Sequence, residues 1–428
     1  MKRLPALFLA VTLLLSGCSP AAERPGGAAE PSATPAIAPV QTSTPAPLPS
    51  PSPSPSPTPE PDPIQERLDA LTARQKVGQL LLAGIEGTQA GQDAAYAVQT
   101  IQAGGIILFG RNVDTCAQAA SLVSSLRELN GDYVPLLIAA DEEGGTVSRM
   151  PEEVRDLPSA YTFGQTGSGA LCRELGQALA AQCAALGINV DFAPVADVWT
   201  DPDNTVIGRR ALGTDGDTVA QLVPQVMAGL EEVGVVPVVK HFPGHGDTDA
   251  DSHYDLPVVS KSLDELTELE LRPFEAAIAD GAPAVMVGHL LMLALDDTLP
   301  ASLSPAVVTG LLREELGFDG VVFTDDLTMG AVSNTYGMGE AAVLAFEAGC
   351  DVLLVCHGQD NLQAAYEALL EAVESGRISQ ARLDESVYRI LKLKADFAMS
   401  NDPVPVPDVD ALNARLDGLL AALEGAAG

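Results

Sequence analysis

Residues 236–241 read Val-Pro-Val-Val-Lys-His, and residues 320–325 read Gly-Val-Val-Phe-Thr-Asp. Each stretch is a short apolar run, rich in β-branched residues, that ends in polar side chains. A continuous apolar run of this length is typical of a strand buried on both faces, as in a parallel sheet. The two stretches therefore predict parallel strands with chemically useful groups at their C-terminal ends.

Six further apolar runs share this character, and helix-like segments such as 260–280 and 361–375 separate them. The eight predicted strands lie at 79–83, 105–109, 134–140, 189–193, 236–240, 284–288, 320–324 and 351–356. Strands that alternate with helices indicate βαβ units, and eight of them fit a single (β/α)8, TIM-like barrel of the α/β class. A doubly wound sheet is the alternative, but no GxGxxG or P-loop pattern follows any strand.

Two helical signals frame this barrel. Thr72 and Gln75 have the spacing of a capping box, which predicts the start of the first helix. A last helix is expected near residues 411–424. We therefore assign residues 64–428 to one barrel domain with a C-terminal helix.

The first 63 residues have a different composition. Lys2 and Arg3 precede an apolar stretch, 4–17, which is too short to span a bilayer comfortably. That stretch ends in Leu-Ser-Gly-Cys, which resembles a bacterial lipobox. We expect residues 1–17 to be a lipoprotein signal peptide and Cys18 to carry the lipid; a plain secretory signal is the alternative.

A proline-rich tether is expected after Cys18. Residues 19–63 hold 15 of the 32 prolines and almost no large apolar side chains, so they cannot form a core. We assign 18–63 to the lipidated cysteine and a disordered linker. The predicted protein is exported, is anchored to a membrane only through its lipid, and faces the cell exterior or the periplasm.

Composition excludes several partners. The formal net charge of −35 argues against nucleic acid, which requires a basic surface. The acidity is interpreted as an aid to solubility, and it leaves room for local arginines that bind a neutral sugar. The six cysteines show no CxxC pair or zinc spacing. Cys350 and Cys356 flank an apolar run and are predicted core residues, and we expect the five cysteines after Cys18 to be mostly free.

Polar residues follow the predicted strands, and the C-terminal strand ends of a barrel meet on one face. This convergence is the main evidence in the residues for an enzyme. The residues concerned are Asp141, Asp191, Lys240, His241, His289, Asp325 and Asp326.

The segment 240–253 does not fit a metal site. His241 and His245 have i, i+4 spacing, but Phe-Pro-Gly between them prevents a continuous helix. The alternating aspartates 247, 249 and 251 resemble an EF-hand loop, yet Ser252 and Val258 stand where glycine and glutamate are required. We expect no metal and no cofactor.

A general acid/base remains for this segment. Asp251 and His253 form an Asp-x-His pair, in which a carboxylate can fix the tautomer of an imidazole and stabilise its protonated form. Asp325, at the end of a rigid strand, is suited to attack an anomeric carbon. One of Asp325 and Asp326 is expected to cap the next helix instead, and we assign that task to Asp326.

These residues resemble the family 3 glycoside hydrolases of the β-N-acetylglucosaminidase type. The resemblance is carried by residues 240–253, KHFPGHGDTDADSH, and 311–331, LLREELGFDGVVFTDDLTMGA, with Asp-Glu-Glu-Gly-Gly at 141–145 and Ile-Gly-Arg-Arg at 207–210. It implies that Asp325 is the nucleophile and that His253, with Asp251, is the acid/base. It further implies that sugar hydroxyls are bound by Asp141, Arg149, Arg210, Lys240 and His241. Arg210 is chosen over Arg209 from its spacing to Leu212-Gly213, while His245 and His289 are left open as structural or functional.

The resemblance implies two-step retaining hydrolysis of terminal, non-reducing β-linked N-acetylglucosamine through a covalent intermediate on Asp325. Peptidoglycan- or chitin-derived oligosaccharides are the expected substrates, and a monomer is the expected state. Phosphorolysis, a β-glucosidase or β-xylosidase, and a non-catalytic sugar-binding lipoprotein are the alternatives. A binding protein has no need of both Asp325 and the Asp251–His253 pair.

Overall fold

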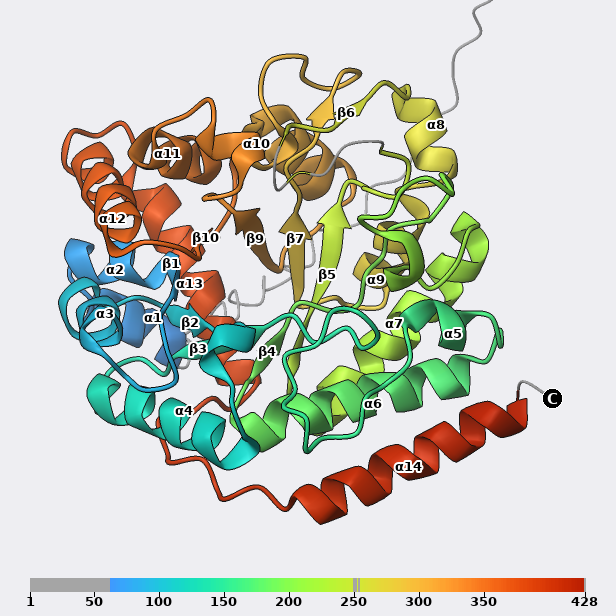
Figure 1. Ribbon diagram of the computed structural model, residues 1–428. Helices are drawn as coiled ribbons and strands as arrows, with labels where there is room; N and C mark the ends of the chain where they lie inside the picture. The colour runs from blue at the N-terminus through green and yellow to red at the C-terminus, as the bar shows by residue number, and fades with distance from the viewer. Residues whose placement is uncertain (1–61, 249–251, 253–254, 427–428) are drawn as a thin grey trace, which may run out of the picture. The chain divides into compact units, whose positions relative to one another are not determined.

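The computed structural model describes residues 62–248, 252 and 255–426. All eight predicted strands are present and form a closed, entirely parallel barrel in the order β1-β10-β9-β7-β5-β4-β3-β2 (Figure 1). The barrel strands are β1 (Leu81–Gly84), β2 (Gly105–Ile107), β3 (Leu137–Ala140), β4 (Val190–Asp191), β5 (Val236–Phe242), β7 (Ala284–Val287), β9 (Val321–Asp326) and β10 (Val352–Val355). The prediction of a (β/α)8 barrel is therefore confirmed.

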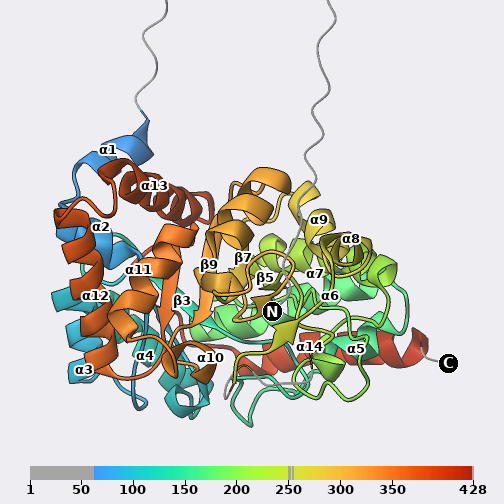
Figure 2. The ribbon, with the colours of Figure 1, turned by 90° about the horizontal axis from the view of Figure 1, so that it is seen from above.

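Helices surround this barrel and connect its strands (Figure 2). They are α1 (Pro63–Asp69), α2 (Ala73–Gln79), α3 (Gln92–Ala95), α4 (Cys116–Asn130), α5 (Ala160–Gly164), α6 (Gly169–Leu186), α7 (Gly216–Val233), α8 (Leu263–Glu268), α9 (Arg272–Ala279), α10 (Gly330–Ser333), α11 (Met338–Ala348), α12 (Gln359–Glu374), α13 (Gln380–Asp396) and α14 (Val409–Ala426). A π-helix over Ala306–Glu315 lies between β7 and β9 in the chain. The capping box of Thr72 and Gln75 is present at the start of α2, as predicted.

The helix predicted at 260–280 is wrong in one respect, because it is two helices. Ser262 and Glu265 form a capping box that starts α8, and the chain leaves the helical conformation at Leu269. Pro273 lies in the first turn of α9, where its missing N–H is no loss. In the middle of a continuous helix the same proline would remove a hydrogen bond, so a new helix starts there.

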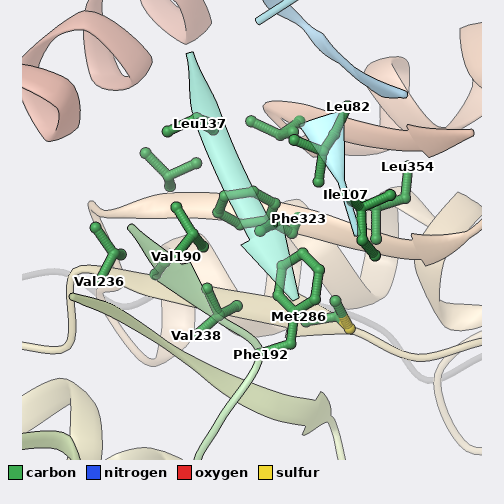
Figure 3. Close-up of a cluster of buried hydrophobic side chains, with 14 of the residues drawn as sticks. Leu82, Ile107, Leu137, Val190, Phe192, Val236, Val238, Met286, Phe323 and Leu354 are labelled. Carbon is green, nitrogen blue, oxygen red and sulfur yellow. The ribbon is translucent and has the colours of Figure 1, made fainter. Parts of the chain in front are cut away.

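Large apolar side chains fill the inside of the barrel. Leu82, Leu137, Val190, Phe192 and Phe323 point into it and are buried (Figure 3). The rings of Phe192 and Phe323 meet edge to face, with 5.8 Å between their centroids. The interior is thus a packed core, and it leaves room for a ligand only at the ends of the strands.

Outside the barrel, α14 packs along α6 (Figure 1) and buries Leu412, Leu416, Leu419 and Leu423. The five cysteines after Cys18 are all buried and free, as expected. A small second sheet pairs β6 (Val258–Val259) with β8 (Leu291–Met292). Among the helices of the described ranges, none has the length and apolar character needed to cross a bilayer.

Candidate active site

A cavity of about 370 Å³ lies at the C-terminal end of the barrel strands. That volume is within the range of small-molecule sites. Its lining comes from strands β2, β5, β7, β9 and β10 and from the segments that follow β2, β3, β4, β5, β9 and β10. The residues are Ile107, Phe109, Asp141, Val147, Arg149, Phe192, Val206, Ile207, Arg210, Lys240, His241, His245, Ser252, Met286, Asp325, Asp326, Thr328, Met329, Leu354, Cys356 and His357.

One wall of the cavity is a charged cluster. The Nζ of Lys240 lies 2.7 Å from Asp141 Oδ1 and 2.6 Å from Glu143 Oε1. Arg210 binds Glu143 with two hydrogen bonds, from Nε at 2.7 Å and from Nη2 at 2.8 Å. Arg149 Nη2 reaches Asp141 Oδ2 at 3.3 Å. Donors and acceptors alternate along this wall, which suits a ligand whose hydroxyl groups both donate and accept.

The charges of this cluster stabilise one another. Burial would raise the pKa of Asp141, but the cations of Lys240 and Arg149 lower it below its ordinary value. Burial would likewise raise the pKa of Glu143, and Arg210 and Lys240 lower it. Burial would lower the pKa of Lys240, while the two carboxylates raise it. The cluster therefore stays fully ionised at neutral pH.

The turn that carries Arg149 is held from beneath by Glu142. Its Oε2 accepts hydrogen bonds from the backbone N–H of Arg149 at 2.7 Å and from Ser148 Oγ at 2.9 Å. Glu142 is fully buried, and burial raises its pKa to about 7. Glu142 thus supports the cavity wall from behind and does not line it.

Asp325 lies at the C-terminal end of β9 and lines the cavity. Its Oδ1 accepts a hydrogen bond from the backbone N–H of Asp326 at 2.8 Å. Burial would raise the pKa of Asp325, but the imidazoles of His289 and His241 lower it, so the carboxylate is ionised. A rigid, ionised carboxylate at a cavity wall is what nucleophilic attack requires.

Asp326 has a structural role, although it is not the predicted helix cap. Its carboxylate accepts hydrogen bonds from Thr328 N at 3.0 Å and Cys356 N at 3.1 Å, which fixes the turn after β9 and joins it to β10. The cap position of α10 is Met329, three residues further on. The prediction was right about which aspartate is structural and wrong about what it binds.

His241 is held by Asp197, a buried carboxylate that the sequence analysis missed. Asp197 Oδ2 lies 2.7 Å from His241 Nδ1, and Asp197 Oδ1 accepts the backbone N–H of His245 at 2.6 Å. Asp197 follows β4 after the apolar stretch Ala193–Ala196. A lone carboxylate after an apolar run was the signal that could have revealed it.

Two of the residues expected at the strand ends, Asp191 and His289, do not line the cavity, and neither does Arg313. Asp191 is fully buried, and its Oδ1 accepts the backbone N–H of Glu142. His289 is also buried, between Ser302 Oγ at 2.7 Å and the backbone oxygen of Asp326 at 2.9 Å. Arg313, part of the 311–331 motif, binds Asp351 just before β10, at the other end of the barrel. These three residues support the structure around the site.

The structure places the remaining predicted residues as follows. Asp141, Arg149, Arg210, Lys240, His241 and Asp325 meet in one cavity, while Arg209 is exposed, with its guanidinium over the ring of Tyr161. Asp251, His253 and Cys18 lie outside the described residues. Ser252, between the two predicted acid/base residues, is buried and lines the cavity.

Two aromatic side chains at the cavity were not predicted. Phe109 follows β2 and His357 follows β10, and their rings stack with 5.6 Å between centroids. Only folding brings them together, since 248 positions separate them in the chain. Within the described ranges, no group of three or more His, Cys, Asp or Glu side chains is arranged to hold a metal ion.

Comparison with known proteins gives a consistent result. A family profile described as "Glycosyl hydrolase family 3 N terminal domain" matches residues 72–393. The chain is 35% identical over 326 residues to a beta-hexosaminidase of Nitrosomonas eutropha, covering 74% of this chain and 92% of that protein. It is 37% identical over 331 residues to beta-hexosaminidase LpqI of Mycobacterium tuberculosis, covering 76% and 83% of the two chains.

Solved structures also resemble this fold. A family 3 beta-N-acetylglucosaminidase from a Paenibacillus species has a TM-score of 0.77 and 44% sequence identity. The similarity covers 82% of this chain and 68% of that one. A beta-N-acetylhexosaminidase from Beutenbergia cavernae has a TM-score of 0.70 and 30% identity, and the match covers 76% and 99% of the two chains.

Proposed function

This chain belongs to glycosyl hydrolase family 3 and is a glycoside hydrolase of the beta-hexosaminidase group, and on that premise we propose that it removes terminal β-linked N-acetylglucosamine with retention of configuration. The observation that carries the proposal is the position of Asp325. An ionised carboxylate at the end of a barrel strand shares a cavity with Lys240, Arg149 and Arg210. The cations supply hydrogen bonds to hydroxyl groups, and the carboxylate supplies the nucleophile.

In the proposed first step, a carboxylate oxygen of Asp325 attacks the anomeric carbon while the bond to the leaving oxygen breaks. His253, supported by Asp251, gives its proton to that leaving oxygen. In the second step a water molecule gives a proton back to His253 and attacks the anomeric carbon, which releases Asp325 as a carboxylate. Asp141, Arg149, Arg210, Lys240 and His241 bind the sugar hydroxyls and hold the ring against Asp325.

The proposed substrates are peptidoglycan- or chitin-derived oligosaccharides. This choice rests on the proposed location, because an exported enzyme meets such glycans outside the cell. We propose that residues 1–17 are a signal peptide, that Cys18 is lipidated, and that the residues between Cys18 and the start of α1 tether the barrel to the membrane. The predicted linker, 18–63, thus ends slightly earlier, because Asp62 caps α1 and Pro63 is its first residue. Expression in a bacterial host should place the wild type in the detergent phase of a membrane extraction and Cys18→Ala in the aqueous phase. Equal partitioning of the two would contradict the anchor.

The enzymatic proposal is tested with the chain from residue 19 onward, which lacks the lipid. We expect release of 4-nitrophenol from the β-N-acetylglucosaminide and far slower release from the β-glucoside. Asp325→Ala should lower kcat by on the order of 10⁴-fold or more. Asp297→Ala is the control, since Asp297 is exposed and away from the cavity. A folded wild type that releases neither sugar would contradict the proposal and favour a sugar-binding lipoprotein.

The role of His253 is tested with leaving groups of different acidity. His253→Ala should lose most activity on substrates with a poor leaving group and little on those whose leaving group needs no proton. Equal losses on both kinds of substrate would exclude His253 as the acid. Release of N-acetylglucosamine 1-phosphate in phosphate buffer would indicate phosphorolysis instead of hydrolysis.

A further inference from the structure

The segments after β4 and β5 lie directly against each other. The backbone N–H of Ala196 donates to Lys240 O at 2.6 Å, and that of Thr200 donates to Gly246 O at 3.3 Å. A Cβ added to Gly246 would lie 1.8 Å from the backbone oxygen of Val198. No other residue fits at position 246, so the two backbones touch without a side chain between them.

Asp197 lies at this junction, where it is fully buried. One oxygen faces His241 Nδ1 at 2.7 Å, and the other accepts the backbone N–H of His245 at 2.6 Å. Burial would raise the pKa of Asp197, but the imidazoles of His241 and His245 and the hydrogen bonds from both residues lower it. An ionised carboxylate can only accept, so both of its oxygens are committed to donors.

The neighbours of His241 fix its tautomer from two sides. Nδ1 faces the carboxylate of Asp197, an acceptor, so Nδ1 must carry a hydrogen. Nε2 lies 3.4 Å from Arg210 Nη2, and a guanidinium can only donate, so Nε2 must hold a lone pair. The two contacts are independent and require the same tautomer. Both residues line the cavity, and Nε2 has a single lone pair, so a substrate hydroxyl that donates to Nε2 takes the place of this 3.4 Å contact with Arg210.

His245 extends the same network. Its Nδ1 lies 2.6 Å from Thr248 Oγ1, and its Nε2 lies 3.4 Å from the hydroxyl of Ser252. Ser252 in turn accepts the backbone N–H of Ala331 through its own backbone oxygen, at 3.2 Å. The carboxylate that orients His241 is thus also bonded to the start of the segment that follows β5.

We propose that Asp197 is a positioning residue: it keeps the hydrogen of His241 on Nδ1, so that Nε2 accepts a substrate hydroxyl, and it anchors the backbone of His245. The inference rests on the proposed function, in which His241 binds a sugar hydroxyl. Asp197 does not line the cavity, so it acts through the two histidines.

Asp197→Asn tests this tautomer control. An asparagine has one acceptor oxygen where the carboxylate has two, so its amide nitrogen must face either His245 N–H or His241 Nδ1. If the amide nitrogen faces His241, two N–H donors point at each other. Transfer of the imidazole hydrogen from Nδ1 to Nε2 removes this clash, but Nε2 can then no longer accept a hydrogen bond from a substrate hydroxyl. We expect kcat/KM on the N-acetylglucosaminide to fall on the order of 10²-fold, mainly through KM. Asp203→Asn, at an exposed aspartate six residues further along, is the matched control.

The tautomer is measured directly by ¹⁵N NMR of histidine-labelled protein, with His241 assigned from its loss in His241→Gln. Wild type and Asp203→Asn should show hydrogen on Nδ1, and Asp197→Asn should show it partly or wholly on Nε2. Hydrogen on Nε2 in the wild type would overturn the proposal, and this measurement does not depend on the variant folding. An unchanged tautomer and unchanged kinetics in folded Asp197→Asn would also overturn it.

The failure of this inference is distinguishable from failure of the proposed function. A wild type with the Nδ1 tautomer but no glycosidase activity would contradict the proposed function alone. An active wild type with the Nε2 tautomer would contradict the role of Asp197 alone.

Discussion

The two ends of the barrel each bury a lysine, and the two lysines have opposite surroundings. Lys240, on β5 at the C-terminal end, lies against Asp141 and Glu143, whose charges raise its pKa. Lys394, on α13 at the N-terminal end, donates to Gln79 Oε1 and Gly104 O, both at 2.8 Å. No carboxylate is among these partners, and burial lowers the pKa of Lys394 to about 7.

The different surroundings of the two lysines reflect the different functions of the two ends of the barrel. At the C-terminal end the charged groups border a cavity, so a ligand can exchange hydrogen bonds with them. At the N-terminal end the charges are enclosed. Asp351 is fully buried there among Arg313, Arg389 and Ser386. Arg389 and Ser386 belong to α13, so their contacts with Asp351 join this helix to the start of β10. Polar groups are therefore arranged for binding at one end and for joining helices to strands at the other.

The largest effect is expected for Lys240→Met. The change removes a charged donor from the cavity and leaves Asp141 with Arg149 alone. We expect kcat/KM to fall by about 10³-fold. Steady-state kinetics on the aryl N-acetylglucosaminide measure it, and Lys392→Met is the control because Lys392 is an exposed surface lysine. An unchanged kcat/KM in Lys240→Met would show that Lys240 does not bind the substrate, and would contradict the different functions assigned to the two ends.

Arg313→Met is expected to affect stability and not catalysis. It removes the 2.5 Å partner of a buried carboxylate at the N-terminal end. We expect a loss of roughly 3 kcal/mol in the free energy of unfolding, with kcat and KM of the folded protein unchanged. Urea denaturation and kinetics on the same sample test both parts. A change in KM without a change in stability would place Arg313 in the site after all.

Arg210→Met and Arg209→Met compare two neighbouring arginines at the C-terminal end of the barrel. Arg210 lines the cavity and binds Glu143 twice, whereas Arg209 is exposed. We expect kcat/KM to fall by about 10²-fold in Arg210→Met and less than twofold in Arg209→Met. Measured side by side, equal losses in the two variants would show that the choice between these neighbours is wrong.

The smallest effect is a pH dependence that comes from Lys394. Its folded pKa of about 7 is below the unfolded value of about 10.4, so between these values the unfolded chain binds the extra proton. The free energy of unfolding should therefore rise with pH in this window, by up to about 1.4 kcal/mol per pH unit. At or below pH 7 this gain is absent.

Lys394→Met should lack this rise. In urea titrations, the free energy of unfolding of the wild type minus that of the variant should increase from pH 7 to 8.5. The buried cysteines affect the pH dependence of both proteins equally, because both proteins contain them, so their effect cancels in this difference. If the free energies of unfolding of the two proteins change with pH in parallel, the pKa of Lys394 is not lowered by burial, and the prediction is wrong.

Much of the fold was predictable because it depends on local pattern. Eight apolar runs and their spacing were enough for the barrel, and the boundaries erred only by a few residues, as where 134–140 became Leu137–Ala140. The helix at 260–280 was the main error. Its apolar periodicity continues across Leu269–Leu271, and it hides the signal of Pro273, which lies in the first turn of a new helix that starts at Arg272.

The site was predictable in part for a different reason. Parallel strands bring their C-terminal ends together whatever their sequence, so Asp141, Lys240, His241 and Asp325 had to be neighbours. Asp191, adjacent to the same strand ends, is buried behind them, since the pleat directs alternate side chains to opposite sides. Residues that meet through loops, such as Phe109 and His357, leave no local pattern.

By itself the sequence determined the barrel, the family resemblance, and which residue types stand at the strand ends. Periodicity and motif spacing are local properties, and every one of these conclusions depends on them. The tertiary structure decided how those residues pair: that Asp197 supports His241, that Glu143 joins Lys240 to Arg210, and that Arg313 serves the opposite end. Such pairings join groups that are distant in the chain, and only the closed barrel sets the distances between them.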